Sequence, residues 1–201
     1  MHDYCLRVKD NAYIKRLLEH IAWQQSREAY KELFMLLHRP LCQFAAGILK
    51  SDYDAEEVVS DVFIQVWEKR HTMDQVEWPR LYFYTAVRNR ALNLLARQKR
   101  QQAVDSAYWQ ITPTLAALNP EELMMTDEML QRLHKAIQEL PPRCRLIYKL
   151  VKEDGLRYRE VAELLEISVK TVEAQMAIAL RRLSTCMQLD IPIHFNRQSK
   201  K

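Results

Sequence analysis

The chain has 201 residues, of which 48% are hydrophobic and 28% are charged, and its formal net charge is +4. Its two glycines are too few for the turns of a parallel α/β enzyme or for a phosphate-binding loop, so the composition favours an all-helical protein. The longest apolar run, FAAGIL, is far shorter than the roughly 20 residues that span a bilayer, and MHDYCLRVKD contains no signal-peptide core. We therefore expect a cytoplasmic protein without membrane insertion.

Apolar residues repeat with helical spacing in the first part of the chain. The pattern predicts one helix over residues 12–23 and a second over 30–48, kinked or interrupted at Pro40. A third helix is predicted to open at Asp54, where Asp54 and Glu57 can accept hydrogen bonds from N–H groups of the first turn. Its acidic residues lie early, where the helix dipole favours negative charge.

Two neighbouring segments carry charge of opposite sign. Residues 52–68 contain six acidic and no basic residues, whereas residues 80–101 contain six basic and no acidic residues. Between them, residues 69–79 predict a loop, and Pro79 can serve as the first residue of a fourth helix. Such segments suggest two different partners, one of them nucleic acid, although solvated helix faces are the plainer alternative.

The helical pattern fades over residues 99–126, which contain two prolines and mixed polarity. A segment of this length between helical units predicts a flexible linker that joins two helical domains. The predicted domains are residues 12–98 and 127–187, with an N-terminal extension at residues 1–11 and a C-terminal tail at residues 188–201. No role can be assigned to the extension or the tail.

The second domain begins with a predicted helix from about residue 127, and Pro141 and Pro142 open the next one. Gly155 is expected to stop that helix as a left-handed residue beyond its end. A short helix over residues 158–165 follows. It leads through a tight turn into a further helix, and the two form a helix-turn-helix pattern.

The second helix of this pattern has the features of a DNA-reading helix. Ser168 can cap it through its hydroxyl. Glu166 occupies a turn position that favours glycine, at a cost of about 1 kcal/mol if its φ is positive. Polar side chains at the N-terminal end of the helix can read base edges in a major groove, and arginines farther along can bind phosphates. These residues are Lys170, Thr171, Ala174, Gln175, Arg181 and Arg182.

The four cysteines are widely separated and form no C-x-x-C pair, which argues against a zinc ribbon or a redox motif. We expect reduced and mostly buried thiols. His38 and Cys42 lie four residues apart and could share a metal, but two ligands do not form a site. A packed helix face is the better interpretation of this pair, so we expect neither a metal nor another cofactor.

Three segments resemble regions of bacterial RNA polymerase sigma factors, especially the extracytoplasmic-function (ECF) group. Region 4 is similar to LPPRCRLIYKLVKEDGLRYREVAELLEISVKTVEAQMAIALRRL, which contains the helix-turn-helix. Region 2 is similar to YKELFMLLHRPLCQFAAGILKSDYDAEEVVSDVFIQVWEKR and to WPRLYFYTAVRNRALNLLARQKR. The resemblance implies a sigma factor that directs core RNA polymerase to promoters, recognises their −35 and −10 elements, and assists promoter melting.

The resemblance also implies three binding surfaces. The acidic third helix would dock on the β′ coiled coil of core polymerase through Glu57, Ser60, Asp61 and Gln65. The basic fourth helix and the loop before it would hold the −10 element as single-stranded DNA through Trp78, Arg80, Arg88, Asn89, Arg90 and Arg97. The helix-turn-helix would bind the −35 duplex and touch the β flap, through Ser168, Lys170, Thr171, Glu173, Ala174, Gln175 and Arg181.

Other interpretations stay open from the residues alone. Tyr82 and Tyr84 could also stack on bases, although Tyr84 falls on an apolar stripe, which favours a core position. A helix-turn-helix regulator without a sigma role would explain the second domain but not the acidic helix. A helical enzyme is disfavoured because no nucleophile and base occur in a recognisable order. ECF proteins commonly have an anti-sigma partner, but no residue here specifies one, and the sequence names neither target promoters nor an inducing signal.

Overall fold

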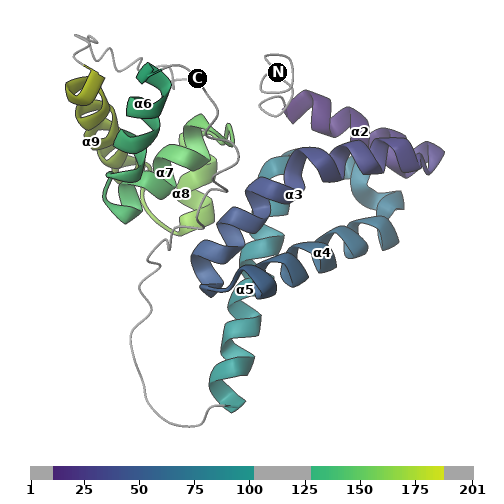
Figure 1. The fold of residues 1–201 in the computed structure, drawn as a ribbon. Helices are drawn as coiled ribbons and strands as arrows, with labels where there is room; N and C mark the ends of the chain where they lie inside the picture. Colours follow the sequence, from purple (N-terminus) through teal and green to yellow (C-terminus); the bar gives the residue numbers. More distant parts are fainter. Residues whose placement is uncertain (1–10, 102–127, 188–201) are drawn as a thin grey trace.

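The fold is described from a computed structural model, which places residues 11–101 and 128–187 (Figure 1). All regular structure in these two ranges is helical, which confirms the predicted all-α class. None of the described helices is long and apolar enough to cross a membrane. The predicted tail and almost all of the predicted N-terminal extension and linker lie outside the described residues.

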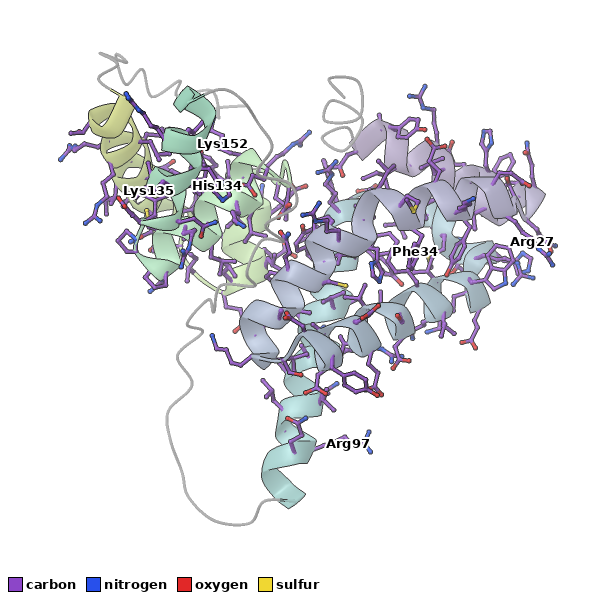
Figure 2. All side chains as sticks on the ribbon, in the orientation of Figure 1. Arg27, Phe34, Arg97, His134, Lys135 and Lys152 are labelled. Carbon is purple, nitrogen blue, oxygen red and sulfur yellow. The ribbon has the colours of Figure 1, made fainter. Side chains whose placement is uncertain are left out.

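The first domain, residues 11–101, is built on an aromatic cluster. Its elements are α2 (Asn11–Gln24), α3 (Arg27–Leu49), α4 (Asp52–Glu68), the 3-10 helix η1 (Arg70–Gln75) and α5 (Pro79–Gln101). α3 packs against α4 and α5, and α2 packs against α3 and η1. Phe34 lies between α3 and α4 (Figure 2), where its ring centroid is 4.9 Å from that of Phe63. Phe63 lies 5.5 Å from Phe83 of α5, so aromatic packing joins three helices.

Helix boundaries in the first domain correct three details of the prediction. The hydroxyl of Ser51 accepts a hydrogen bond of 3.2 Å from the Asp54 N–H and caps α4. The helix therefore begins at Asp52, and the predicted start at Asp54 is wrong. α3 runs without a break across Pro40, because packing of its apolar face outweighs the one hydrogen bond that proline cannot donate. The predicted loop before α5 contains η1, whereas Pro79 opens α5 as predicted.

The second domain, residues 128–187, packs around its last helix. Its elements are α6 (Glu128–Gln138), α7 (Pro142–Lys152), α8 (Tyr158–Leu165) and α9 (Val169–Met187). α6, α7 and α8 each contact α9, which buries Val172, Met176 and Ala179. Gly155, between α7 and α8, has a φ of 73°, which confirms its predicted left-handed conformation.

The two domains lie against each other. Figure 1 shows α7 and α8 beside α3, and α8 also contacts α5. Buried residues of both domains belong to one continuous apolar cluster, which includes Phe44 and Tyr84 of the first domain and Ile147 and Leu164 of the second. This contact brings the α7–α8 segment onto the basic helix of the first domain.

Candidate partner and nucleic-acid interfaces

The acidic surface is the outer side of α4. The helix buries a stripe that includes Val58, Val62 and Phe63 against the rest of the first domain. Glu57 and Asp61 are one helical turn apart on the other side, so their charges share a face. All residues predicted to bind polymerase are exposed or partly exposed there: Glu57, Ser60, Asp61 and Gln65.

Asp61 forms an ion pair with Arg90 of α5, and this pair links two surfaces for which different partners are predicted. Asp61 belongs to the predicted polymerase surface and Arg90 to the predicted −10 surface. The two side chains are 49% and 37% exposed, so the pair contributes at most about 1 kcal/mol. A partner that competes for either side chain can therefore break this pair at small cost.

The predicted −10 surface runs from Trp78 along α5, and its residues differ in how far they reach the solvent. Asn89 and Arg97 are exposed, and Arg97 projects from the end of α5 that lies far from the second domain (Figure 2). Trp78 is 43% exposed. In contrast, Arg80 is only 1% exposed and the Arg88 side chain only 16%. The structure therefore buries one of the predicted DNA-binding arginines, Arg80, and leaves a second, Arg88, only partly exposed.

Side chains of the second domain cover the N-terminal half of α5. The Glu166 carboxylate lies 2.8 Å from the Arg88 guanidinium, in an ion pair between the domains. The Arg157 guanidinium lies 4.8 Å from the centroid of the Trp78 ring, which is a cation–π contact. Two residues of the second domain thus contact this part of the first domain. Arg157 lies on the Trp78 ring, and Glu166 pairs with Arg88.

Asp154, between α7 and α8, faces the Arg80 and Tyr84 side chains of α5. Burial raises the pKa of Asp154 to about 7, and the Tyr84 hydroxyl and Arg80 offset only part of that shift. Burial, together with Asp154, also holds the pKa of Tyr84 well above its ordinary value. Tyr84 is 1% exposed, as its place on the apolar stripe predicts, and its hydroxyl makes no hydrogen bond of good geometry with the described residues. Asp154 is therefore an acid that exchanges its proton near neutral pH.

The helix-turn-helix forms as predicted from α8, a short turn and α9. Glu166 ends α8 with a φ of 54° and a ψ of 45°, so the cost of about 1 kcal/mol for a left-handed non-glycine residue applies. The Ser168 hydroxyl accepts a hydrogen bond of 3.1 Å from the Thr171 N–H and caps α9. All residues predicted to read the −35 element are exposed or partly exposed: Ser168, Lys170, Thr171, Glu173, Ala174, Gln175 and Arg181.

Three residues at the contact between the domains were missed by sequence reasoning. Asp154 and Arg157 received no role, and Glu166 was treated only as part of the turn. Asp154 and Glu166 face side chains of α5, and Arg157 faces Trp78 directly before that helix, so all the partners lie far earlier in the chain. Because no local spacing links such pairs, no pattern in the sequence could have identified them.

The His38–Cys42 pair forms a packed helix face on α3. The Cys42 sulfur lies 3.7 Å from the His38 Nε2, and the Phe34 ring stacks on His38 at 4.3 Å. Burial, with help from the carboxylates of Glu56 and Asp52, raises the pKa of Cys42 to about 11. The thiol is thus protonated at neutral pH. Within the described ranges, no three His, Cys, Asp or Glu side chains are grouped so that they could hold a metal ion.

Comparison with known proteins finds the same two regions. Sigma-70 region 2 matches residues 33–101, and Sigma-70 region 4 matches residues 130–183. The chain is 27% identical over 154 residues to the ferric citrate uptake sigma factor FecI of Escherichia coli K12, a match that covers 75% of this chain and 86% of FecI. It is 26% identical over 142 residues to the ECF RNA polymerase sigma-E factor of the same organism, over 67% of this chain and 74% of that protein.

A solved structure shares the fold. The sigma factor RpoE from Bartonella quintana, crystallised with the anti-sigma factor NepR, superposes with a TM-score of 0.50 at 21% identity, over 81% of this chain and 98% of RpoE. The two matched regions occupy the two helical domains in the predicted order. The chain therefore belongs to the sigma-70 family of sigma factors, in the ECF group, and directs promoter-specific transcription. A regulator without a sigma role does not account for the match to region 2.

Proposed function

We propose that this sigma factor divides its task among three surfaces. α4 binds the β′ coiled coil of core RNA polymerase, Trp78 and α5 hold the −10 element as single-stranded DNA, and α9 reads the −35 element as a duplex. The chain acts in the cytoplasm, and an anti-sigma partner is consistent with the complex of RpoE with NepR. Of the residues predicted for these surfaces, those on α4 and α9 are exposed or partly exposed, whereas Arg80 of α5 is buried.

The opposite charge of α4 and α5 is the observation that carries the proposal. α4 presents acidic side chains such as Glu57 and Asp61 to the solvent, and these would repel DNA phosphates. An exposed acidic face instead complements a basic protein surface, and charge complementarity speeds the encounter of the two. The basic helix beside it is suited to the polyanionic partner.

The −10 surface combines the two kinds of side chain that single-stranded DNA requires. Bases that leave the duplex stack on aromatic rings, and cations follow the phosphates. Trp78 provides an exposed ring at the start of α5, and Asn89 and Arg97 are exposed along it. Arg80 and Arg88 join this surface in the proposal once they become accessible.

The −35 surface is the N-terminal end of α9. Gln175 can form two hydrogen bonds with adenine, Thr171 can contact a thymine methyl group, and Lys170 can reach a base edge or a phosphate. Each such preference is worth about 1–3 kcal/mol. Because polymerase and the chain connection hold both domains near one promoter, two modest DNA contacts add up to stable binding.

The proposal is tested by transcription with purified components. The full chain and core RNA polymerase are incubated with a library of genomic fragments, and the 5′ ends of the transcripts are sequenced. We expect start sites that share two upstream sequence elements and that are absent with core polymerase alone. Failure to initiate at any specific site would reject the proposed role.

A matched pair of variants tests the polymerase surface. Glu57→Lys reverses an exposed charge that has no ion-pair partner among the described residues, and we expect it to weaken core binding by roughly tenfold. Glu56→Lys makes the same change one residue away, where the carboxylate influences Cys42 on the α3 side. Equal affinities of both variants and the unmodified chain for core polymerase would remove α4 from the interface.

A further inference from the structure

Trp23, at the C-terminal end of α2, is an exposed aromatic residue to which the proposed function gives no role. Its side chain is 78% exposed, whereas the apolar stripe of the same helix, which includes Leu18 and Ile21, is buried. The ring therefore contributes little to the core of the first domain. Its exposure calls for a function outside the folding of the chain.

The faces of the Trp23 ring are free of other stacking side chains. Arg70 lies 5.0 Å from the centroid of the Trp67 ring, and Arg157 lies 4.8 Å from that of Trp78. Trp23 makes no such contact with an aromatic ring or a guanidinium among the residues that the structure describes. Of the three tryptophans in these ranges, it therefore offers the most open surface for stacking.

A hydrogen bond holds the Trp23 ring in one direction. The indole Nε1–H donates to Asp74 Oδ2 of η1 at 3.1 Å. The backbone beside the ring is also fixed, because the Ser26 N–H donates to the His20 carbonyl oxygen at 3.4 Å and Gln25 turns the chain into α3 with a φ of 50°. A ring that is oriented before it meets a partner loses little conformational entropy on binding. Trp23 is thus a preformed flat surface.

This surface lies beside the segment that leads into the predicted −10 surface. α2 packs against η1 and also contacts α5. Asp74, the hydrogen-bond partner of Trp23, precedes Trp78 by four residues, so their Cα atoms are at most about 14 Å apart. A single DNA strand with one base on Trp78 can therefore reach Trp23 within a few nucleotides.

The neighbours of Trp23 suit a nucleic acid better than a protein. Gln24, Gln25 and Arg27 are exposed, and Arg27 lies at the end of the first domain where α3 begins (Figure 2). An aromatic ring among polar and positive side chains is typical of a site that stacks bases, whereas the centre of a protein interface groups several apolar anchors. Glu28 is also exposed there, so charge attracts DNA only weakly and stacking must supply most of the affinity.

We propose that Trp23 is a second stacking site for the melted promoter strand, and that Asp74 positions its ring. The strand leaves the −10 element single-stranded toward the start site, because polymerase needs an unpaired template there. A base on that side of the one at Trp78 would lie on the Trp23 indole. The inference rests on the proposed function. Because every base has a face that can stack, the site adds affinity without sequence preference.

Two forked DNA probes test the site. Both contain the promoter elements obtained by transcript mapping, and their single strand either ends at the −10 element or continues by several thymines toward the start site. Holoenzyme, assembled from core polymerase and the full chain, is titrated with each probe. For Trp23→Ala we expect roughly tenfold weaker binding of the extended probe and unchanged binding of the short one. Equal affinities of this variant and the unmodified chain for both probes would overturn the inference, and so would equal losses on both.

Three further variants separate stacking from a structural role. Trp23→Phe keeps an aromatic face, and we expect it to retain most of the affinity for the extended probe. Asp74→Ala releases the ring, and we expect a smaller loss than for Trp23→Ala. Tyr53→Ala removes a ring that is 79% exposed at the end of α4 farthest from η1, and it should leave the ratio of the two affinities unchanged. A loss in Trp23→Phe as large as in Trp23→Ala would argue against stacking.

The salt dependence of binding gives an independent readout. A stacked base adds no phosphate contact, so Trp23→Ala should keep the slope of affinity against salt on the extended probe. Arg97→Gln, on the predicted −10 surface, should lower that slope by about one. A lower slope in Trp23→Ala would mean that the loss comes from displaced phosphate contacts.

Binding to core polymerase without DNA separates the remaining outcomes. Weaker core binding by Trp23→Ala would assign the ring to a protein interface and overturn this inference. Specific initiation by the unmodified chain, together with unchanged probe binding by Trp23→Ala, would overturn the inference alone and leave the proposed function standing. Failure of the unmodified chain to initiate at any specific site would reject the proposed function, and the stacking site with it.

Discussion

The two predicted DNA surfaces differ in what determines their accessibility. The −35 surface is presented by one helix and its cap, and its predicted residues reach the solvent. On the −10 surface, Arg80 is buried beside Asp154 of the other domain and Arg88 pairs with its Glu166. One surface is therefore complete within a short stretch of sequence, whereas the state of the other depends on contacts between residues far apart in the chain.

This difference shows that a residue whose type suits DNA binding is not necessarily accessible to DNA. Lys170 and Arg88 are both positively charged helix residues that are predicted to contact DNA. Lys170 is exposed because the turn before α9 fixes which side of the helix faces outward. Arg88 is withdrawn because Glu166 of the other domain pairs with it.

The largest effect that we expect is a pH dependence of the free energy of unfolding, and it arises at the −10 surface. Asp154 lies at the covered surface, facing Tyr84 and Arg80 of α5, with Glu153 and Lys149 on its own side. Its pKa rises from an ordinary 3.8 to about 7 in the folded chain, so the folded state holds the proton more tightly than the unfolded chain does. The protonated acid thus contributes stability that is complete below pH 4 and is lost as the pH rises to about 7.

The variant that tests this effect is Asp154→Asn, which keeps the shape of the protonated acid and cannot ionise. At about 1.4 kcal/mol per pKa unit, the shift sets an upper limit of about 4 kcal/mol for the change in unfolding free energy. We expect urea denaturation to give similar stabilities for the two chains near pH 4 and a more stable Asp154→Asn chain at pH 7.5. Parallel pH profiles would show that Asp154 is not desolvated by the contact between the domains.

Most helices could be predicted from the sequence because their signals are local. Pro79 opens α5, residues 158–165 form α8, and Gly155 adopts a positive φ, all as predicted. The start of α4 was mistaken because Asp54 and Ser51 both offer cap oxygens near the same turn, and only the backbone geometry decides between them. Such an error of two residues does not change which face of the helix is buried.

The site was predictable only in part, because sequence patterns carry local signals and do not report contacts between distant residues. Exposure of Glu57 and of the α9 residues follows from helical periodicity, which fixes the buried stripe of each helix. Burial of Arg80 violates that reasoning, because arginines are rarely buried without compensation. Arg80 lies one turn before Tyr84 on the buried stripe of α5 and interacts with Asp154 of the second domain, a partner that spacing along the chain does not encode.

A smaller effect, of about 1 kcal/mol in each domain, compares two serine caps. Ser51 caps α4 with a hydrogen bond of 3.2 Å, and Ser168 caps α9 with one of 3.1 Å. We expect Ser51→Ala and Ser168→Ala to lower the free energy of unfolding by similar amounts in urea titrations. Only Ser168→Ala should also weaken binding of a −35 duplex at equal temperature and salt, because only that hydroxyl lies on a predicted DNA surface. Equal loss of duplex binding in both variants would mean that Ser168 acts through stability alone.

The same substitution at the two glycines is expected to change stability in opposite directions, and Gly47→Ala gives the smallest effect. Gly47 lies inside α3, and a methyl group added there would meet no atom within 4 Å. Gly47→Ala should therefore raise the free energy of unfolding by about 0.5–1 kcal/mol, because alanine loses less backbone entropy in a helix. Gly155 has a φ of 73°, where a side chain is strained, so Gly155→Ala should lower that free energy by about 1 kcal/mol or more.

This glycine pair also sharpens the comparison between the domains. Gly47 lines a small hollow between the domains, and Gly155 directly follows Asp154. Because the methyl group of Gly47→Ala enters open space, we expect the radius of gyration of that chain to match the unmodified one. Gly155→Ala displaces the turn that presents Asp154 to Tyr84, so it should also flatten the pH dependence of stability between pH 4 and 7. A destabilised Gly155→Ala chain with an unchanged pH profile would show that the turn does not control the protonation of Asp154. The contact of the second domain with α5 would then depend on Glu166 and Arg157 alone.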